Sequence, residues 1–209
     1  MAINGEYHLG IMLINPLVTE CPYDLNAAMT QDFGDLTAVY VFENKKKYAL
    51  ISKEFCKINN IRVNELHAAA LQQQREYHSF VFESLETFVQ DIFPEIVEPE
   101  NEMLYPVWML SMDSDTHGAS VILQPEALIA IEEIFGGDYF ILPSSIHEVI
   151  VVPDLGIDDQ EHDLNEMVRK VNHMVVDPED RLSDRVIRAS EFLRLIEPPE
   201  KRIGRDPQL

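Results

Sequence analysis

The sequence has no lysine or arginine between Arg75 and Arg169, a gap of 93 residues in a chain of 209. This interval contains 21 Asp and Glu residues, whereas the 16 acids outside it are matched by the 16 bases of the chain. The whole negative excess, a net charge of -21, therefore lies in one central stretch. Such a stretch cannot bind nucleic acid by neutralising phosphates, so it favours either solubility or a basic protein partner.

Several other features are missing. No apolar run approaches the roughly 18 to 20 residues that span a membrane, and the N-terminus lacks the basic and apolar regions of a signal peptide. The two cysteines, Cys21 and Cys56, have no metal-ligand spacing, which is typical of reduced cytosolic thiols. Neither a G-x-G-x-x-G nor a Walker pattern occurs. We therefore expect a cytoplasmic protein with no membrane association and no cofactor.

The first half of the chain predicts strands followed by helices. Aromatic and β-branched runs indicate strands, and Ser52 suits the N-cap of a helix. A helix that begins at Ser84 is stopped by Pro94. The expected strands are 7–15, 36–43 and 48–52, and the expected helices are 53–60, 63–76 and 84–93.

The second half repeats this mixture. Pro125 suits the first turn of a helix that ends at Gly136 or Gly137. The expected strands are 106–112, 119–124, 138–142, 146–152 and 183–190, and the expected helices are 125–137, 159–175 and a weak one ending at 196. The strands at 138–142 and 146–152 are apolar on both faces, so we expect them at the centre of a sheet. Adjacent strand pairs with helices between them predict an α+β fold, with a mainly antiparallel mixed sheet and helices packed on its faces.

The segment 94–105 is acidic, contains proline and has little to pack, which is typical of a linker. It divides the chain into an N-terminal α+β part, 1–93, and a C-terminal α+β part, 106–196, although one continuous domain over 1–196 is the alternative. The polar segment 197–209 is expected to be a mobile tail.

His147 and Glu148 stand together inside an apolar run and are the first catalytic candidates. On a regular strand they point to opposite faces, so they cannot form one acid–base pair. Ser145 and His147 share a face, but their Cβ atoms are then roughly 6.5 to 7 Å apart, which is long for a nucleophile and its base. The alternative is structural, with the serine in a turn and a buried Glu148 paired to Arg169 or Arg185.

Six histidines are scattered along the sequence, and they are His8, His67, His78, His117, His162 and His173. His162 and Glu166 lie one turn apart on a predicted helix and could share a metal ion. Two ligands alone do not make a site, so we expect no metal site.

Four stretches resemble an uncharacterised domain family of Gram-positive gut bacteria and their mobile elements. They are "GDLTAVYVF", "INNIRVNELHAAAL", "LQPEALIAIEEIFGGDYFILPSSIHEVIVVPD" and "LNEMVRKVNHMVVDPEDRLSDRVIR". The resemblance covers most of 7–190 and is most specific at 136–154 and 167–188. Members of that family are longer at the N-terminus, so the chain resembles a shortened form. The resemblance implies a phage or mobile-element setting but supplies no activity.

Charge and resemblance together predict a non-enzymatic acidic module that binds a basic protein surface. The partner could be a host nuclease that binds nucleic acid, which would make the module anti-CRISPR-like, and its oligomeric state is left open. One alternative is a hydrolase or ribonuclease that uses His147, Glu148 and Ser145. Another is an accessory module whose charge serves solubility alone. The acids expected to carry the binding are Glu98, Glu100, Glu102, Asp158, Asp159 and Glu161.

Overall fold

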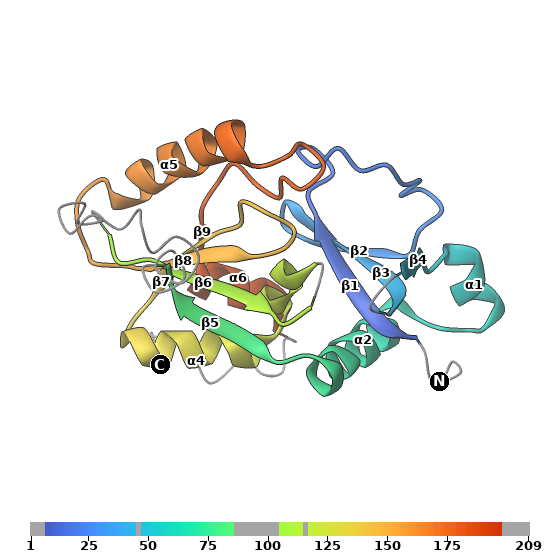
Figure 1. The fold of residues 1–209 in the computed structure, drawn as a ribbon. Coiled ribbons are helices and arrows are strands. Elements are labelled where there is room, and N and C mark those ends of the chain that lie inside the picture. The colour runs from blue at the N-terminus through green and yellow to red at the C-terminus, as the bar shows by residue number, and fades with distance from the viewer. Residues whose placement is uncertain (1–6, 45–46, 86–104, 115–116, 198–209) are drawn as a thin grey trace.

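The protein folds as two antiparallel sheets with helices packed against them (Figure 1). A computed structural model describes residues 7–44, 47–85, 105–114 and 117–197. The first sheet has the strand order β1-β3-β2, with β4 paired to β3, and the second has the order β5-β6-β8-β7-β9. The predicted α+β class is confirmed.

The elements of the first sheet lie close to the sequence-based boundaries, except for the strand at 30–33, which was not expected. They are β1 (His8–Ile14), β2 (Thr30–Phe33), β3 (Leu36–Asn44), β4 (Lys47–Leu50), α1 (Lys53–Ile58) and α2 (Val63–Tyr77). Ser52 caps α1, because its side chain accepts a hydrogen bond from the backbone N–H of Phe55.

The second sheet and its helices occupy the rest of the described chain. They are β5 (Phe80–Ser84), β6 (Trp108–Met112), η1 (Gly118–Leu123), α4 (Pro125–Phe135), β7 (Tyr139–Leu142), β8 (Val149–Pro153), α5 (Gln160–Val175), β9 (Ile187–Arg188) and α6 (Ala189–Ile196). As expected, α4 begins at Pro125 and ends against Gly136, which adopts a positive φ of 71°.

Strand β7 shows why the second sheet is covered on both faces. Tyr139 and Ile141 belong to the main core, which includes side chains of α4 and α6, whereas Phe140 and Leu142 pack in a second cluster with Leu164 of α5. Side chains alternate along a strand, so a strand that is apolar throughout needs cover on each side. The prediction that β7 and β8 lie inside a sheet is confirmed.

One hydrophobic core joins the two sheets. Its buried side chains come from β1 and β3 as well as from β6, β7 and β8. The 3-10 helix η1 contacts both β1 and β6, and all six of its residues are buried. The two sheets therefore share an interior, and the ends of β1 and β3 lie near the segment that precedes η1.

Several sequence-based assignments were wrong or incomplete. Of the expected strand 183–190, only Ile187–Arg188 forms a strand, and α6 begins at Ala189. The segment 119–124 was expected to be a strand but forms η1, because periodicity cannot separate a short buried strand from a short buried helix. No element was expected at 80–84, where β5 pairs with β6. The expected helix beyond Ser84 and the expected linker lie outside the described residues, except for Leu85 and the buried Tyr105.

Strand β8 starts three residues later than the predicted 146–152. Ser145 forms an isolated bridge with Arg181, and the backbone N–H of Ile146 donates to the carbonyl of Asp180. The chain bends at Ile146 and His147 before it joins the sheet at Val149.

Helix α5 buries only part of its predicted apolar stripe. Leu164 and Val168 are buried, whereas Met167, Val171 and Met174 are exposed. None of the described helices is long and apolar enough to cross a membrane.

Candidate metal centre

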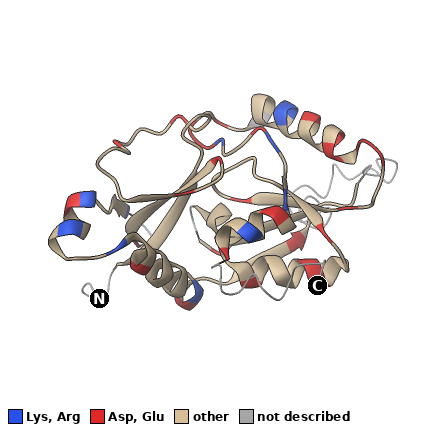
Figure 2. Cartoon of the chain, turned by 180° about the vertical axis from the view of Figure 1, so that it is seen from behind, with Lys and Arg blue, Asp and Glu red and all other residues tan. Residues whose placement is uncertain are grey.

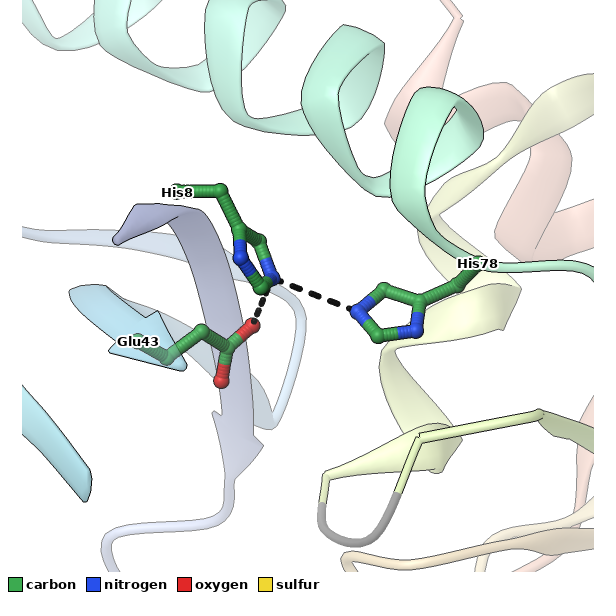
Figure 3. Close-up of side chains that lie close together, drawn as sticks. All are labelled: His8, Glu43 and His78. Atoms are coloured by element: carbon green, nitrogen blue, oxygen red, sulfur yellow. Dashed lines mark hydrogen bonds and ion pairs between the residues drawn. The ribbon is translucent and has the colours of Figure 1, made fainter. Parts of the chain in front are cut away.

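His8 and Glu43 are direct partners across the β1–β3 ladder, at the end of the first sheet. The Nε2 atom of His8 lies 3.6 Å from Oε1 of Glu43, and the two side chains are only 12% and 13% exposed (Figure 3). Residues directly opposite each other on antiparallel strands have neighbouring side chains, so the strand register alone brings this pair together.

His78 approaches the pair from another element. It caps the C-terminus of α2, and its Nε2 atom lies 3.3 Å from Nε2 of His8 (Figure 3). The backbone N–H of Leu9 donates to Oε1 of Gln73 at 2.7 Å, which ties β1 to α2. The ring of Tyr77 stacks on that of His8 with 4.6 Å between centroids. The end of α2 is therefore held beside His8.

The three side chains offer one ligand atom each, and these atoms all lie within 4.8 Å of one another. Ligands that bind Zn²⁺ at about 2.0 to 2.1 Å in a tetrahedron are themselves about 3.3 to 3.4 Å apart. The separations of 3.3 Å and 3.6 Å around His8 fit that spacing. Two histidines and one carboxylate suit a first-row divalent ion such as Zn²⁺ or Fe²⁺.

Asp113 contacts the ring nitrogen of His78 that faces away from His8. Its Oδ1 atom lies 3.4 Å from Nδ1 of His78 and also accepts a hydrogen bond from the backbone N–H of Ser79 at 2.8 Å. A carboxylate at Nδ1 favours the tautomer with the proton on that nitrogen. The lone pair of Nε2 then points towards His8, as a metal ligand requires.

His117 lies on the other side of Glu43. Its Nδ1 atom is 3.8 Å from Oε2 of Glu43, and the side chain is 6% exposed. That distance is too long for a hydrogen bond, and Nδ1 is buried without a hydrogen-bond partner among the described residues. The ring of Tyr48, a residue of β4 that pairs with Glu43, packs edge-on against His117 at 5.1 Å.

Glu43 is a carboxylate anion at neutral pH. Its burial acts to raise the pKa, but His117 and His8 beside it outweigh that effect and lower the pKa to about 2. A buried carboxylate with two imidazoles around it supplies negative charge without any proton competing for its oxygens near pH 7.

Gly10 makes room for this carboxylate. A Cβ atom at Gly10 would overlap Oε1 and Cδ of Glu43, so the carboxylate packs directly against the backbone of β1. A glycine in the middle of a strand often marks such a close approach.

The residues that sequence reasoning favoured for catalysis are elsewhere. Oγ of Ser145 accepts a hydrogen bond from the backbone N–H of His147, and the imidazole of His147 instead faces Asp180, with Nε2 3.3 Å from Oδ1. Glu148 is half-buried, and in the described part of the chain it forms no ion pair with Arg169 or Arg185. The bend before β8 removes the strand geometry from which the opposite orientation of His147 and Glu148 was argued.

Of the six acids expected to bind a partner, three belong to the residues that the structure describes. Glu98, Glu100 and Glu102 lie outside the described residues. Asp158 and Asp159 are exposed just before α5, and Glu161 lies 3.4 Å from Nε of Arg188.

The described acids are distributed over several helices, strands and loops rather than gathered on one element (Figure 2). His162 and Glu166 are exposed on α5, and Glu166 pairs with Arg169 at 2.7 Å. His162 and Glu166, which were considered as metal ligands and not expected to form a site, are not part of the cluster at His8.

Fold and cluster together define an α+β protein of two antiparallel sheets with a candidate two-histidine, one-carboxylate centre. The chain belongs to the family of unknown function DUF5688, whose model matches residues 22–188. This range includes Glu43, His78, Asp113 and His117, whereas His8 precedes it. Comparison with curated proteins and with solved structures gave no match.

Proposed function

We propose that the protein binds one first-row divalent metal ion through His8 Nε2, Glu43 Oε1 and His78 Nε2. The observation that carries the proposal is the convergence of these three atoms, with Asp113 holding the proton of His78 on the far side of its ring. Nε2 of His78 then presents a lone pair to Nε2 of His8 at 3.3 Å. Either a metal ion or a hydrogen on Nε2 of His8 can lie between these nitrogens, and among metal ions the donor set matches Zn²⁺, Fe²⁺ or Co²⁺ rather than Mg²⁺ or Ca²⁺.

The competing occupant is a proton. A proton on Nε2 of His8 would satisfy either His78 or Glu43 without any metal. Both occupants account for the same short separations around His8, so only a binding measurement separates them.

The test is calorimetric titration of EDTA-treated protein with Zn²⁺, together with thermal unfolding at increasing Zn²⁺. We expect one ion per chain and a melting temperature that rises with the concentration of the ion, since a ligand bound only by the folded state stabilises it by about 2.7 kcal/mol at 100 times its Kd. His78→Ala and Glu43→Gln should abolish both effects. His162→Ala changes an exposed histidine of α5 and serves as the control. Absence of Zn²⁺ binding by the unaltered protein would assign the cluster to a shared proton.

We also propose that the protein is an acidic module that binds a basic protein surface. Asp158 and Asp159 are exposed, form no ion pair with any described residue, and follow the exposed Ile157. Exposed acids beside an apolar side chain suit a partner with a basic and partly apolar surface. Under this second proposal the protein acts in the cytoplasm, in a phage or mobile-element setting. Its partner is a nuclease that binds nucleic acid, such as a CRISPR effector.

Its test is inhibition of DNA cleavage by a CRISPR effector of the host at increasing NaCl. Inhibition should weaken steeply with salt and further in the double variant Asp158→Lys/Asp159→Lys. Glu83→Lys, which reverses an exposed charge on β5, is the control. Inhibition that is insensitive to salt would remove the proposal. The imidazole of His147 faces Asp180, and Oγ of Ser145 bonds the backbone of His147 instead, so this geometry gives the hydrolase alternative no support.

A further inference from the structure

Three protein ligands leave a divalent ion incompletely coordinated. Structural zinc sites have four protein ligands, whereas catalytic sites have three and keep a position for water or substrate. Whether the centre formed by His8, Glu43 and His78 remains open depends on Glu43, because a carboxylate can bind through one oxygen or through both.

The two oxygens of Glu43 face different histidines. Oε1 lies 3.6 Å from His8, and Oε2 lies 3.8 Å from His117 on the opposite side. The carboxylate has little freedom to turn, because it packs against the backbone at Gly10. Oε1 is therefore the oxygen directed towards His8, whereas Oε2 is directed towards His117.

His117 has two unusual features that point to a role. Its backbone is in the left-handed region, with φ of 62°, which is uncommon for a residue other than glycine. Its Nδ1 is buried and lacks a hydrogen-bond partner among the described residues, although buried polar atoms are nearly always paired. Backbone strain and an unpaired polar atom at one residue are typical of a functional position.

The ring of His117 is fixed by its surroundings. The carbonyl of His117 accepts a hydrogen bond from Oγ of Ser120 at 2.8 Å, which anchors the residue at the start of η1. The edge-on contact with Tyr48 limits rotation of the ring. Nδ1 is therefore held facing Oε2 of Glu43.

We infer that His117 is a positioning residue that keeps Glu43 bound to the metal through Oε1 alone, so that the ion retains an open position for a water molecule or a small anion. The inference rests on the proposed metal binding. In the loaded protein the Nδ1–H of His117 donates to Oε2, which removes that oxygen from the metal. The second sheet, through η1, thereby sets the coordination of an ion whose first ligands lie on the first sheet.

The experiment uses the full chain loaded with Co²⁺ and titrated with azide, followed by visible absorption. We expect the Co²⁺ bands of the unaltered protein to shift with azide in a saturable manner, because azide enters the open position. His117→Asn should behave in the same way, since an asparagine amide can donate from the place of Nδ1 and tolerates a positive φ. His117→Leu has nearly the same shape as that asparagine but no donor. It should still bind Co²⁺, with azide affinity reduced by about tenfold or more as Glu43 becomes bidentate.

The outcomes separate the two proposals. Failure of Co²⁺ and Zn²⁺ to bind overturns both. Binding of Co²⁺ with no response to azide overturns the open position alone. Equal azide affinities in the unaltered protein and in His117→Leu overturn the role of His117. If His117→Leu fails to fold, Tyr48→Leu is tested in its place, because this change removes the ring that holds His117. A loss of azide affinity in Tyr48→Leu supports the role of His117, and an unchanged affinity overturns it.

Discussion

Asp113 and His78 come from different parts of the fold, and their side chains meet with Oδ1 3.4 Å from Nδ1. Asp113 follows β6 of the second sheet, whereas His78 ends the helix that packs on the first sheet. Asp113, next to β6, and His117, next to η1, both lie against the cluster. The candidate centre is thus built on one sheet and oriented by the other.

Asp113→Asn should weaken Zn²⁺ binding by about 10- to 100-fold, as loss of a carboxylate behind a ligating histidine does elsewhere. The asparagine oxygen can still accept the hydrogen bond from Ser79, so the fold should be retained. Calorimetric titration measures the affinity, and Glu83→Gln on β5 is the matched control. An affinity equal to that of the unaltered protein would mean that Asp113 does not orient His78.

Gly10→Ala should abolish Zn²⁺ binding with little effect on folding. The added Cβ would overlap the end of the Glu43 side chain, so the carboxylate must move away from His8 while β1 stays paired. Alanine is otherwise well tolerated in a strand. Thermal unfolding in EDTA and a Zn²⁺ titration test the two parts separately.

Gly137→Ala is the control for this change, because a Cβ at Gly137 would meet no atom within 4 Å. It should bind Zn²⁺ normally. Tight binding by Gly10→Ala would contradict the placement of Glu43 against β1.

Arg188→Gln should lower the free energy of unfolding by about 1 kcal/mol. The expected loss is small because the Arg188 side chain is partly exposed to solvent, which screens its ion pairs. Arg188 bonds Asp154 at 2.6 Å, lies 3.8 Å from Asp138 and 3.4 Å from Glu161, and covers the ring of Phe140 at 4.6 Å. The hydrogen bond to Arg188 also lowers the pKa of Asp154. Urea unfolding measures the change.

Arg62→Gln provides the comparison for Arg188, because Arg62 pairs with Glu65 in an exposed position at the start of α2. Its unfolding midpoint should stay at that of the unaltered protein. A similar midpoint for Arg188→Gln would show that the three carboxylates around Arg188 contribute nothing to stability.

Much of the fold could be read from the sequence because its signals are local. The aromatic and β-branched runs of β1 and β3, the serine cap of α1 and the proline start of α4 each act within a few residues. The errors fell where tertiary contacts decide. The segment 119–124 is apolar throughout, and its position between two sheets, not its periodicity, makes it a 3-10 helix.

The candidate metal centre, in contrast, could not be predicted from local signals in the sequence. His8 and Glu43 stand at the outer ends of two predicted strands, which was the one available signal. Their contact depends on the register of β1 against β3, which the hydrophobic pattern fixes only once the strands are known to pair. His78 adds a contact over 70 residues of chain, which no spacing rule connects.

Acid should destabilise the protein through His67 between pH 6.5 and about pH 4. Burial lowers the pKa of His67 from 6.5 to about 4, and its Nδ1 lies 3.0 Å from the hydroxyl of Tyr40. Within this window the unfolded chain binds a proton at His67 and the folded chain does not. Stability therefore falls as the pH falls through the window, and this contribution stops changing below about pH 4.

His67→Asn removes the titrating imidazole, whereas the asparagine side-chain amide can still donate a hydrogen bond to the hydroxyl of Tyr40. Between pH 7 and pH 4.5, in EDTA, its melting temperature should fall less than that of the unaltered protein, because unfolding takes up about one proton fewer. His162→Asn changes an exposed histidine and should follow the unaltered protein across the same range. If His67→Asn lost as much stability as the unaltered protein, the acid sensitivity would have to come from other groups, and the neutral, buried state assigned to His67 would be wrong.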